Sequence, residues 1–550
     1  MKISSVIGQD QKDFEKICQT FQWEVPRYLN LGQDLCDKHA DEPAKVAIFF
    51  EDEKGKEQKM TFGELIKLSN KFANVLKGLG VQQGDRVSVI LPQRPETVIS
   101  HIGIYKLGAI ALPLSVLFQK DALEYRLQNS EAKVVVIAQE DAFKVREVIS
   151  KLPQLKKIII VGKEEEGEVN FWKALDMASS EFGYRKTKAE DPAILIYTSG
   201  TTGPPKGSLH AHRFMIGHFP SFELSHNFFP KEGDVLWSPA DWAWGGGLFD
   251  ALFPCLHYGV PILAHREGKF DAEKALYMID KYGVKNTFIW PTALKMMRQV
   301  KGIKSKYSIK LRSITSGGES VGEEVIKWGE EDLGVTINEF FGQTEVNYVT
   351  GNCSAIMKVK PGSMGKPYPG HSVDLIDEKG NPVKTGEIGE VVVKRPDPVM
   401  FLGYWQNEKA TQEKFLGDWW RMGDLARRDE DGFFWFEGRN DDIIGSAGYR
   451  IGPSEIENCL LKHPAVVQAA AVGSPDKVRG EIVKAFVKLA EGYSPSEELI
   501  KELQEQVKKN LAFYEYPREI EFIDEFPMTT TGKIRRVELK RREIEKKKIK

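Results

Sequence analysis

The segment 197–207 carries the residue types that handle phosphate. Within eleven residues it has four aliphatic hydroxyl side chains, three glycines and one lysine, directly after the apolar run 193–196. Glycines let the backbone approach an anion, hydroxyl and backbone N–H groups donate hydrogen bonds to its oxygens, and a lysine supplies positive charge. The Walker pattern is not met, because Pro205 and Gly207 replace its second glycine and its hydroxyl residue. The segment predicts a phosphate-binding loop of another kind, with an ordinary surface loop as the alternative.

Further motifs downstream decide between these two interpretations. In chain order they are Ser316-Gly317-Gly318-Glu319, the segment 338–345, Tyr404-Trp405, Gly423-Asp424, the segments 438–444 and 448–451, and the segment 527–533. Their order and spacing closely resemble the acyl-adenylate-forming superfamily, which contains AMP-forming acyl-CoA synthetases, firefly luciferase and nonribosomal peptide adenylation domains. The resemblance covers nearly the whole chain, from about residue 30 to about residue 536.

Length, composition and charge narrow the class of protein. At 550 residues the chain is several times the usual single-domain size, so more than one hydrophobic core is expected. Its 41% hydrophobic and 28% charged residues are typical of a globular enzyme. The net charge of −2 gives no long-range attraction to nucleic acid or to an anionic membrane, so we expect neither as a partner.

Cysteine usage and the N-terminus bear on the cellular compartment. The five cysteines are scattered, odd in number and never in a C-x-x-C pair, which argues against a disulfide framework and a zinc site. Residues 1–8 lack the apolar core of a signal peptide, and the longest apolar stretch, 102–118, is interrupted by Lys106 and Pro113. The sequence therefore predicts a cytoplasmic protein without membrane insertion.

Alternating apolar runs and helical patterns in the first half predict layered α/β structure. The runs 86–91, 134–137 and 158–161 are typical of buried strands, and Thr61 with Glu64 forms a capping box before a helix. Strands that alternate with helices in this way favour parallel sheets.

The pattern of expected strands and helices changes twice in the second half of the chain. Residues 361–438 have short strands separated by Gly, Pro and Asp, which predicts a small β-rich unit. After the polar break 440–442 an α+β module begins, with strands near 466–472 and 482–489 and a helix near 496–510. In the resembled family this break is a hinge, so we predict an N-terminal domain, residues 1–440, and a mobile C-terminal domain, residues 441–550. The basic tail 540–550 is interpreted as a solvated helix end.

The resemblance implies a first half-reaction in which a carboxylic acid attacks ATP to give an acyl-adenylate and pyrophosphate. It implies Lys206, Thr344 and Glu345 as catalytic residues, with Glu345 as the Mg²⁺ ligand, since Mg²⁺ prefers one or two carboxylates plus phosphate oxygens. Asp424 resembles the acid that accepts both ribose hydroxyls, and Arg439 a second ribose or phosphate contact. The implied nucleotide-binding set is Thr198, Ser199, Gly200, Thr201, Thr202, Gly203, Gly317, Gly318, Glu319, Asn338, Glu339, Phe340, Phe341, Gly342, Gln343, Thr344, Asp424 and Arg439.

Lys533 would by resemblance reach the carboxylate and the α-phosphate, where a cation stabilises the charge that builds up during displacement. The segment 527–533 also fits the Pro-x-x-x-x-Gly-Lys pattern in which family members are silenced by lysine acetylation. A lysine acetyltransferase that acts on Lys533 is therefore left open as a partner. For the second half-reaction the small domain would swing about Asp441 and present a loop to CoA. That loop comprises Ser446, Ala447, Gly448, Tyr449 and Arg450.

The acyl pocket is expected around Trp242, Trp244, Gly245 and Gly342. Core packing is the usual explanation for a tryptophan, but the three glycines 245–247 make a poor core segment. Asp241 offers an alternative, since an aspartate binds the substrate amino group in peptide adenylation domains. Acetate-specific relatives have a tryptophan where this chain has Gly342, which predicts an open pocket.

The combined prediction is an AMP-forming acyl-CoA synthetase with ATP, Mg²⁺ and CoA, acting on acids of about four to eight carbons, branched or hydroxylated chains included. The alternatives are an acetyl- or propionyl-CoA synthetase, a ligase that loads a carrier protein, and a catalytically silent binding scaffold. A homo-oligomer is left open.

Overall fold

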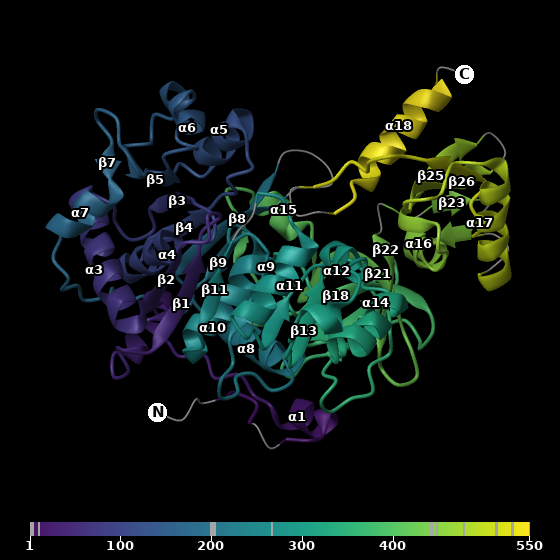
Figure 1. Ribbon diagram of the computed structural model, residues 1–550, viewed down its shortest axis with the longest axis horizontal. Coiled ribbons are helices and arrows are strands. Elements are labelled where there is room, and N and C mark those ends of the chain that lie inside the picture. The colour runs from purple at the N-terminus through teal and green to yellow at the C-terminus, as the bar shows by residue number, and fades with distance from the viewer. Residues whose placement is uncertain are drawn as a thin grey trace.

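The computed structural model describes residues 5–8, 11–198, 205–265, 268–439, 442, 444–446, 449–476, 479–511, 515–529 and 533–548. A large body is formed by the first four fifths of the chain, and a smaller C-terminal unit lies at the upper right in Figure 1. Among the described residues, each helix is too short or too polar to span a membrane.

One sheet of the large body has eight strands. In spatial order they are β19 (Gly403–Tyr404), β9 (Lys206–Ala211), β8 (Pro192–Thr198), β4 (Ile110–Pro113), β3 (Arg86–Ile90), β5 (Val134–Ala138), β6 (Lys157–Val161) and β7 (Val169–Asn170). β3, β5 and β6 pair in parallel, as their apolar runs predict. α3 (Phe62–Gly78) begins at the predicted capping box, in which Thr61 Oγ1 accepts from Glu64 N and the Glu64 carboxylate accepts from Thr61 N.

The other large sheet has nine strands. They are β16 (Lys366–Pro367), β15 (Thr350–Gly351), β14 (Ile337–Phe341), β13 (Ser313–Gly317), β12 (Asn286–Phe288), β10 (Leu236–Trp237), β11 (Ile262–Ala264), β1 (Val46–Glu51) and β2 (Glu57–Thr61). Helices of this region are α9 (Gly245–Gly247), α11 (Ala272–Lys281), α12 (Pro291–Arg298), α13 (Ile303–Lys306) and α14 (Glu323–Trp328).

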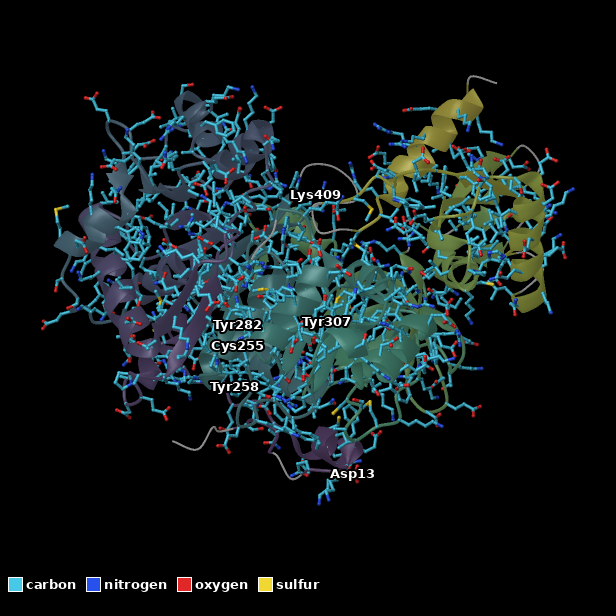
Figure 2. All side chains as sticks on the ribbon, viewed as in Figure 1. Asp13, Cys255, Tyr258, Tyr282, Tyr307 and Lys409 are labelled. Atoms are coloured by element: carbon cyan, nitrogen blue, oxygen red, sulfur yellow. The ribbon has the colours of Figure 1, made fainter. Side chains whose placement is uncertain are left out.

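Helices packed between these two sheets form the main core. Val87 and Val89 of β3 share a cluster with Ile48 of β1, whereas Ile90 belongs to a cluster on the opposite face of its sheet. Helices α2 (Leu31–Leu35), α4 (Pro95–Leu107), α8 (Phe214–Ser225) and α10 (Phe253–Tyr258) contribute to the shared cluster. Every residue of α4 is buried, as expected for a helix covered on all sides. Cys255 and Tyr258 of α10 likewise lie within the body in Figure 2.

The predicted small β-rich unit is a five-stranded sheet. It consists of β17 (Val373–Ile376), β18 (Ile388–Lys394), β21 (Trp419–Arg428), β20 (Phe415–Leu416) and β22 (Phe434–Arg439), with α15 (Glu408–Gln412) beside it in the chain. Its long hairpin, β21 with β22, places Asp424 opposite Arg439.

The C-terminal unit combines a second five-stranded sheet with helices. Its elements are β23 (Ile444–Ser446), β24 (Tyr449–Ile451), α16 (Pro453–Leu461), β25 (Val466–Asp476), β26 (Gly480–Leu489), α17 (Glu497–Asn510), β27 (Glu519–Phe522) and α18 (Arg536–Lys548). The two strands and the helix predicted here are present, and Ser496 caps α17 by accepting from Leu499 N. The predicted α/β class, with an α+β C-terminal unit, is thereby confirmed.

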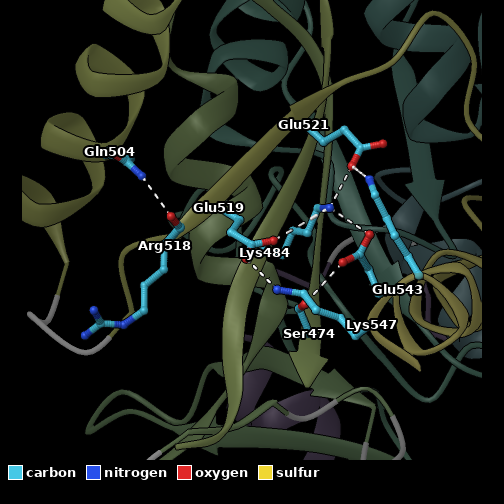
Figure 3. Close-up of polar contacts among 9 residues, drawn as sticks. Ser474, Lys484, Gln504, Arg518, Glu519, Glu521, Glu543 and Lys547 are labelled. Atoms are coloured by element: carbon cyan, nitrogen blue, oxygen red, sulfur yellow. Dashed lines mark hydrogen bonds and ion pairs between the residues drawn. The ribbon is translucent and has the colours of Figure 1, made fainter. Parts of the chain in front are cut away.

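The basic tail is helical as expected, but α18 is not simply a solvated helix end. Leu539 and Glu543 are 1% and 2% exposed, so one face of α18 is buried on the sheet. Lys484 of β26 donates to Glu543 at 2.7 Å and to Glu521 at 2.6 Å, and Lys547 donates to Glu519 at 2.7 Å. Figure 3 shows these contacts joining α18 to β26 and β27. The mixed charges of the tail thus serve docking because their partners lie on the neighbouring strands.

Lys484→Ala should lower the stability of the C-terminal sheet by about 3–5 kcal/mol, because Glu543 would remain as a buried carboxylate without its cation. Native-state hydrogen exchange of the β26 amides measures this loss. Lys547→Ala removes a half-exposed pair and should cost no more than about 1 kcal/mol. Equal, small effects of the two substitutions would show that the buried ion pair does not hold α18 in place.

Candidate active site

A cavity of about 980 Å³ lies where β13 and β14 end. The two strands are parallel, with Gly317 opposite Phe340, so their carboxyl ends open at one edge of the sheet. The sequence-predicted residues that line this cavity are Thr198, Lys206, Trp244, Gly245, Gly317, Gly318, Glu319, Glu339, Phe340, Phe341, Gly342, Gln343, Thr344, Glu345, Asp424, Arg439 and Lys533. Segments more than 300 residues apart therefore meet at one place.

The end of the cavity expected to take phosphate is built on the hairpin of β8 and β9. Thr198 and Lys206 lie opposite each other where β8 ends and β9 begins. Lys206 Nζ is 5.1 Å from the centre of the Tyr404 ring, and the Tyr404 hydroxyl donates to Glu345 Oε1 at 2.7 Å. The aromatic ring thus brings a cation and a carboxylate to the same wall. Ser199, Gly200, Thr201, Thr202 and Gly203 lie outside the described residues.

Asp424 is a buried acid held by two partners from different segments. Gln343 Nε2 donates to its Oδ2 at 2.5 Å, and Arg439 Nη1 lies 3.9 Å from Oδ1. Burial raises the pKa of Asp424 to about 6, and Arg439 and Gln343 oppose that rise. The carboxylate is therefore mostly ionised at neutral pH and available to accept two hydrogen bonds.

Lys533 of the C-terminal unit reaches into the cavity of the large body. A Cβ atom added to Gly318 would come within 3.2 Å of Lys533 Cε and 3.3 Å of its Nζ, so the lysine lies directly over this glycine. Water in the cavity still reaches the side chain, but enclosure by the surrounding protein lowers the pKa of Lys533, while Glu319 and Asp424 oppose the shift. The ammonium group therefore lies in the field of these two acids.

Glu339 lies in the cavity wall with little compensation for its charge. It is 4% exposed, and its Oε2 has no hydrogen-bond partner among the described residues. Burial raises the pKa of Glu339 to about 8. At neutral pH this side chain is mainly protonated, so it adds little negative charge where an anionic ligand would bind.

Three predicted site residues do not line the cavity. Trp242 is 1% exposed and packs in the main core, which corrects its assignment to the acyl pocket. Asn338 is also buried, and its amide donates to Ser225 O at 2.7 Å, so it supports β14 rather than facing a ligand. Ser446 is buried in β23 within the C-terminal sheet.

The remaining residues of the predicted hinge and CoA loop carry less information. Asp441, Ala447 and Gly448 lie outside the described residues. Tyr449 and Arg450 form the start of β24, which pairs with β23.

The cavity also has lining residues that the sequence motifs did not indicate. These are, among others, Phe249, Asp250, Trp290, Lys295, Asn347, Glu457 and Arg536. Asp250 was detectable as the one acid within the apolar run 248–256, a placement that burial without a partner would make costly. The others carry no comparable local signal.

Comparisons with known proteins agree with this site and fold. Residues 36–405 match the AMP-binding enzyme family, and residues 455–533 match the AMP-binding enzyme C-terminal domain. The chain is 37% identical to the acetyl-coenzyme A synthetase of Bacillus subtilis (strain 168) over 97% of this chain and 95% of that protein. It is also 37% identical to the mitochondrial acyl-coenzyme A synthetase ACSM3 of Rattus norvegicus, over 98% of this chain and 95% of that protein.

The fold is also similar to that of a solved structure. The anthranilate CoA ligase AuaEII in complex with anthranoyl-AMP superposes with a TM-score of 0.88 at 30% identity, covering 95% of this chain and 99% of that one. The predicted enzyme class and the resemblance to acyl-adenylate-forming enzymes are confirmed by these matches. The chain belongs to the AMP-binding enzyme family.

Proposed function

We propose that this enzyme is an AMP-forming acyl-CoA synthetase that joins short- and medium-chain carboxylic acids to CoA through an acyl-adenylate. The observation that carries the proposal is the position of Lys533 over Gly318, in one cavity with Lys206, Glu345 and Asp424. This arrangement supplies cations for a triphosphate, an acid for a ribose and a lysine for the reacting atoms.

In the first half-reaction, two anions must approach each other before the carboxylate can attack the α-phosphate. Lys206 and Lys533 reduce their repulsion, and positive groups preorganised in a cavity act most strongly on charge that develops in the transition state. Asp424 accepts from the ribose hydroxyls, with Arg439 beside it. Gly317 lies tightly against Phe340, where a Cβ atom would be 2.8 Å from Phe340 O, and Gly317, Gly318 and Phe341 would form a wall for the adenine.

Glu345 fits a magnesium site of the kind used with nucleotides. The described residues contain no cluster of three or more His, Cys, Asp or Glu side chains that could hold a metal ion. Mg²⁺ would be held by Glu345 together with phosphate oxygens of ATP. When bound, the ion would neutralise part of the phosphate charge. Tyr404 fixes the carboxylate through the 2.7 Å hydrogen bond to Oε1.

In the second half-reaction, the acyl group passes from AMP to the thiol of CoA. Lys533 occupies the cavity in the present arrangement, so we propose that the C-terminal domain, residues 441–550, turns about Asp441 before the thiol enters. The loop 446–450 would then face CoA. Free CoA as acceptor distinguishes this function from a ligase that loads a carrier protein, and release of AMP distinguishes it from a binding scaffold.

Glycines around the acyl part of the cavity support acids of about four to eight carbons over acetate, since each buried methylene is worth about 0.8 kcal/mol. Gly245 and Gly342 both line the cavity. A tryptophan at position 342 is not a simple filler here, because a Cβ atom on Gly342 would lie 2.3 Å from Tyr348 N. A Cβ atom on Gly245 would make an ordinary 3.5 Å contact with Phe249. Gly245 is therefore the better position for testing the pocket.

Lys533→Ala should reduce pyrophosphate release by about 10²–10³-fold, because a positive charge at the reacting centre is lost. Conversion of supplied acyl-adenylate and CoA to thioester should be largely retained. The control is Lys540→Ala, which removes a lysine of α18 that forms an ion pair with Glu481 at 2.9 Å. Equal loss of both half-reactions in a folded Lys533→Ala protein would reject this role.

Acetylation of Lys533 would remove the same charge and should have the same effect.

Asp441→Pro should impair thioester formation more than adenylation, because proline fixes φ and restricts the proposed rotation. Single-turnover measurement of the two steps in the same variant provides its own control. Unchanged rates of both steps would show that Asp441 is not the pivot.

Gly245→Val should lower kcat/KM for six- to eight-carbon acids by about 10–200-fold and affect shorter acids less, because the added methyl groups occupy space used by the chain. A panel of straight-chain acids from two to eight carbons measures the profile. Gly78→Ala, at an end of α3 with no atom within 4 Å of the added carbon, is the control. A wild-type preference for acetate, or an unaltered profile in Gly245→Val, would move the specificity wall elsewhere.

A further inference from the structure

Asp250 is a buried acid at the acyl side of the cavity that none of the steps above uses. It lies in the π-helical turn η3 (Leu248–Leu252), between α9 and α10, and is 3% exposed. Its neighbours in this turn are all apolar, and the residue still lines the cavity. A π-helical turn is an uncommon local structure that often occurs at functional sites.

The contacts of Asp250 satisfy one of its oxygens. Asn347 Nδ2 donates to Oδ1 at 2.6 Å, and His218 Nε2 lies 3.3 Å from the same oxygen. No hydrogen bond to Oδ2 is made within the part of the chain that the structure describes. A role limited to fixing Asn347 and His218 therefore leaves half of the carboxylate unused.

The cost of burying Asp250 is reflected in its pKa. Burial raises the pKa of Asp250, while His218 and Asn347 oppose the rise. An apolar residue at this position would avoid the cost, because a carboxyl group is expensive to bury unless its hydrogen-bonding capacity is fully used. The expense is offset if a ligand supplies the missing hydrogen bond.

Asp250 also lies close to the backbone around Gly342, which lines the cavity. A Cβ atom on Gly342 would be 3.0 Å from Asn347 Cα, and Asn347 is the residue that donates to Asp250. Phe249, next to Asp250 in the chain, would contact a side chain at Gly245. Asp250 therefore lies next to the residues that we propose form the walls around the acyl chain.

We propose that Asp250 is a specificity-determining residue that accepts a hydrogen bond from a hydroxyl group at the far end of the acyl chain, so that ω-hydroxy acids are preferred to the corresponding unsubstituted acids. This inference rests on the proposed acyl-CoA synthetase function. A hydroxyl group fits better than an ammonium group because it has one donor to satisfy, and Asp250 offers one unused oxygen, whereas an ammonium group has three donors.

The test compares matched pairs of acids with the full-length protein. Butanoate, pentanoate and hexanoate are each compared with their ω-hydroxy derivatives, and kcat/KM for CoA thioester formation is measured. At the chain length that reaches Asp250, we expect the wild-type enzyme to favour the hydroxy acid by about tenfold or more, because a site built to bind a hydroxyl rejects an analogue that lacks it.

Asp250→Leu should abolish this preference, so that kcat/KM falls by about tenfold or more further for the hydroxy acid than for the unsubstituted acid. Because both acids are measured on the same variant, the ratio within each pair removes any general effect of the substitution on folding or turnover. Asp250→Asn keeps nearly the same shape, and its NH2 group can donate to the hydroxyl oxygen while its carbonyl oxygen still accepts from Asn347, so it should retain part of the preference. Binding of unreactive acyl-sulfamoyl adenosines, with and without the ω-hydroxyl group, gives a readout that does not depend on turnover.

Each contrary outcome has a separate meaning. If unsubstituted acids form thioesters and Asp250→Leu leaves the ratio within each pair unchanged, the role of Asp250 is overturned while the proposed function stands. A stronger preference for ω-amino acids than for ω-hydroxy acids would also overturn it, in favour of a bound ammonium group. Absence of thioester formation with every acid would reject the proposed function and this inference with it.

Discussion

Lys533 lies over Gly318, where a side chain would crowd it. The φ of +92° at Gly318 suits glycine, and a Cβ atom there would lie 3.2 Å from Lys533 Cε. The glycine at the end of β13 therefore provides both the turn and the room for a lysine from the C-terminal unit. Because that lysine belongs to the smaller unit, the charge inside the cavity depends on how the two parts of the chain are arranged. The proposed division of the reaction into two steps follows from this dependence.

The charges around that contact favour an anionic ligand. Lys206, Arg439 and Lys533 line the cavity together with several acids. Two of these acids have raised pKa values because they are buried, about 6 for Asp424 and about 8 for Glu339. Glu339 is thus largely neutral at neutral pH, and Asp424 remains ionised beside Arg439. Charges in such an enclosed site interact more strongly than in water, so a triphosphate would gain most from the cations.

The part of the cavity proposed to hold the acyl chain follows a different principle, in which shape comes from missing side chains and polarity comes from acids such as Asp241 and Asp250. Gly245 leaves open space beside Phe249, and Trp244 packs edge to face against Phe118 at 5.6 Å. Asp250 adds a carboxylate to a wall that includes the apolar side chains of Phe249 and Trp244. In the proposed function the nucleotide part serves every substrate, whereas the acyl part must distinguish among acids.

The sequence by itself determined the family, the layered α/β class, the positions of β3, β5, β6 and α17, and the motifs that meet in the cavity. These features depend on residues close together in the chain, such as the capping box of Thr61 and Glu64 or the apolar runs of parallel strands. Only the tertiary structure decided that Trp242 is core while Trp244, two residues later, faces the cavity. It also decided that Asp250 meets Asn347, 97 residues further along, and that the basic tail docks through Glu543 onto Lys484. The direction of a side chain and the identity of its partner depend on how distant elements pack, and no local pattern contains that information.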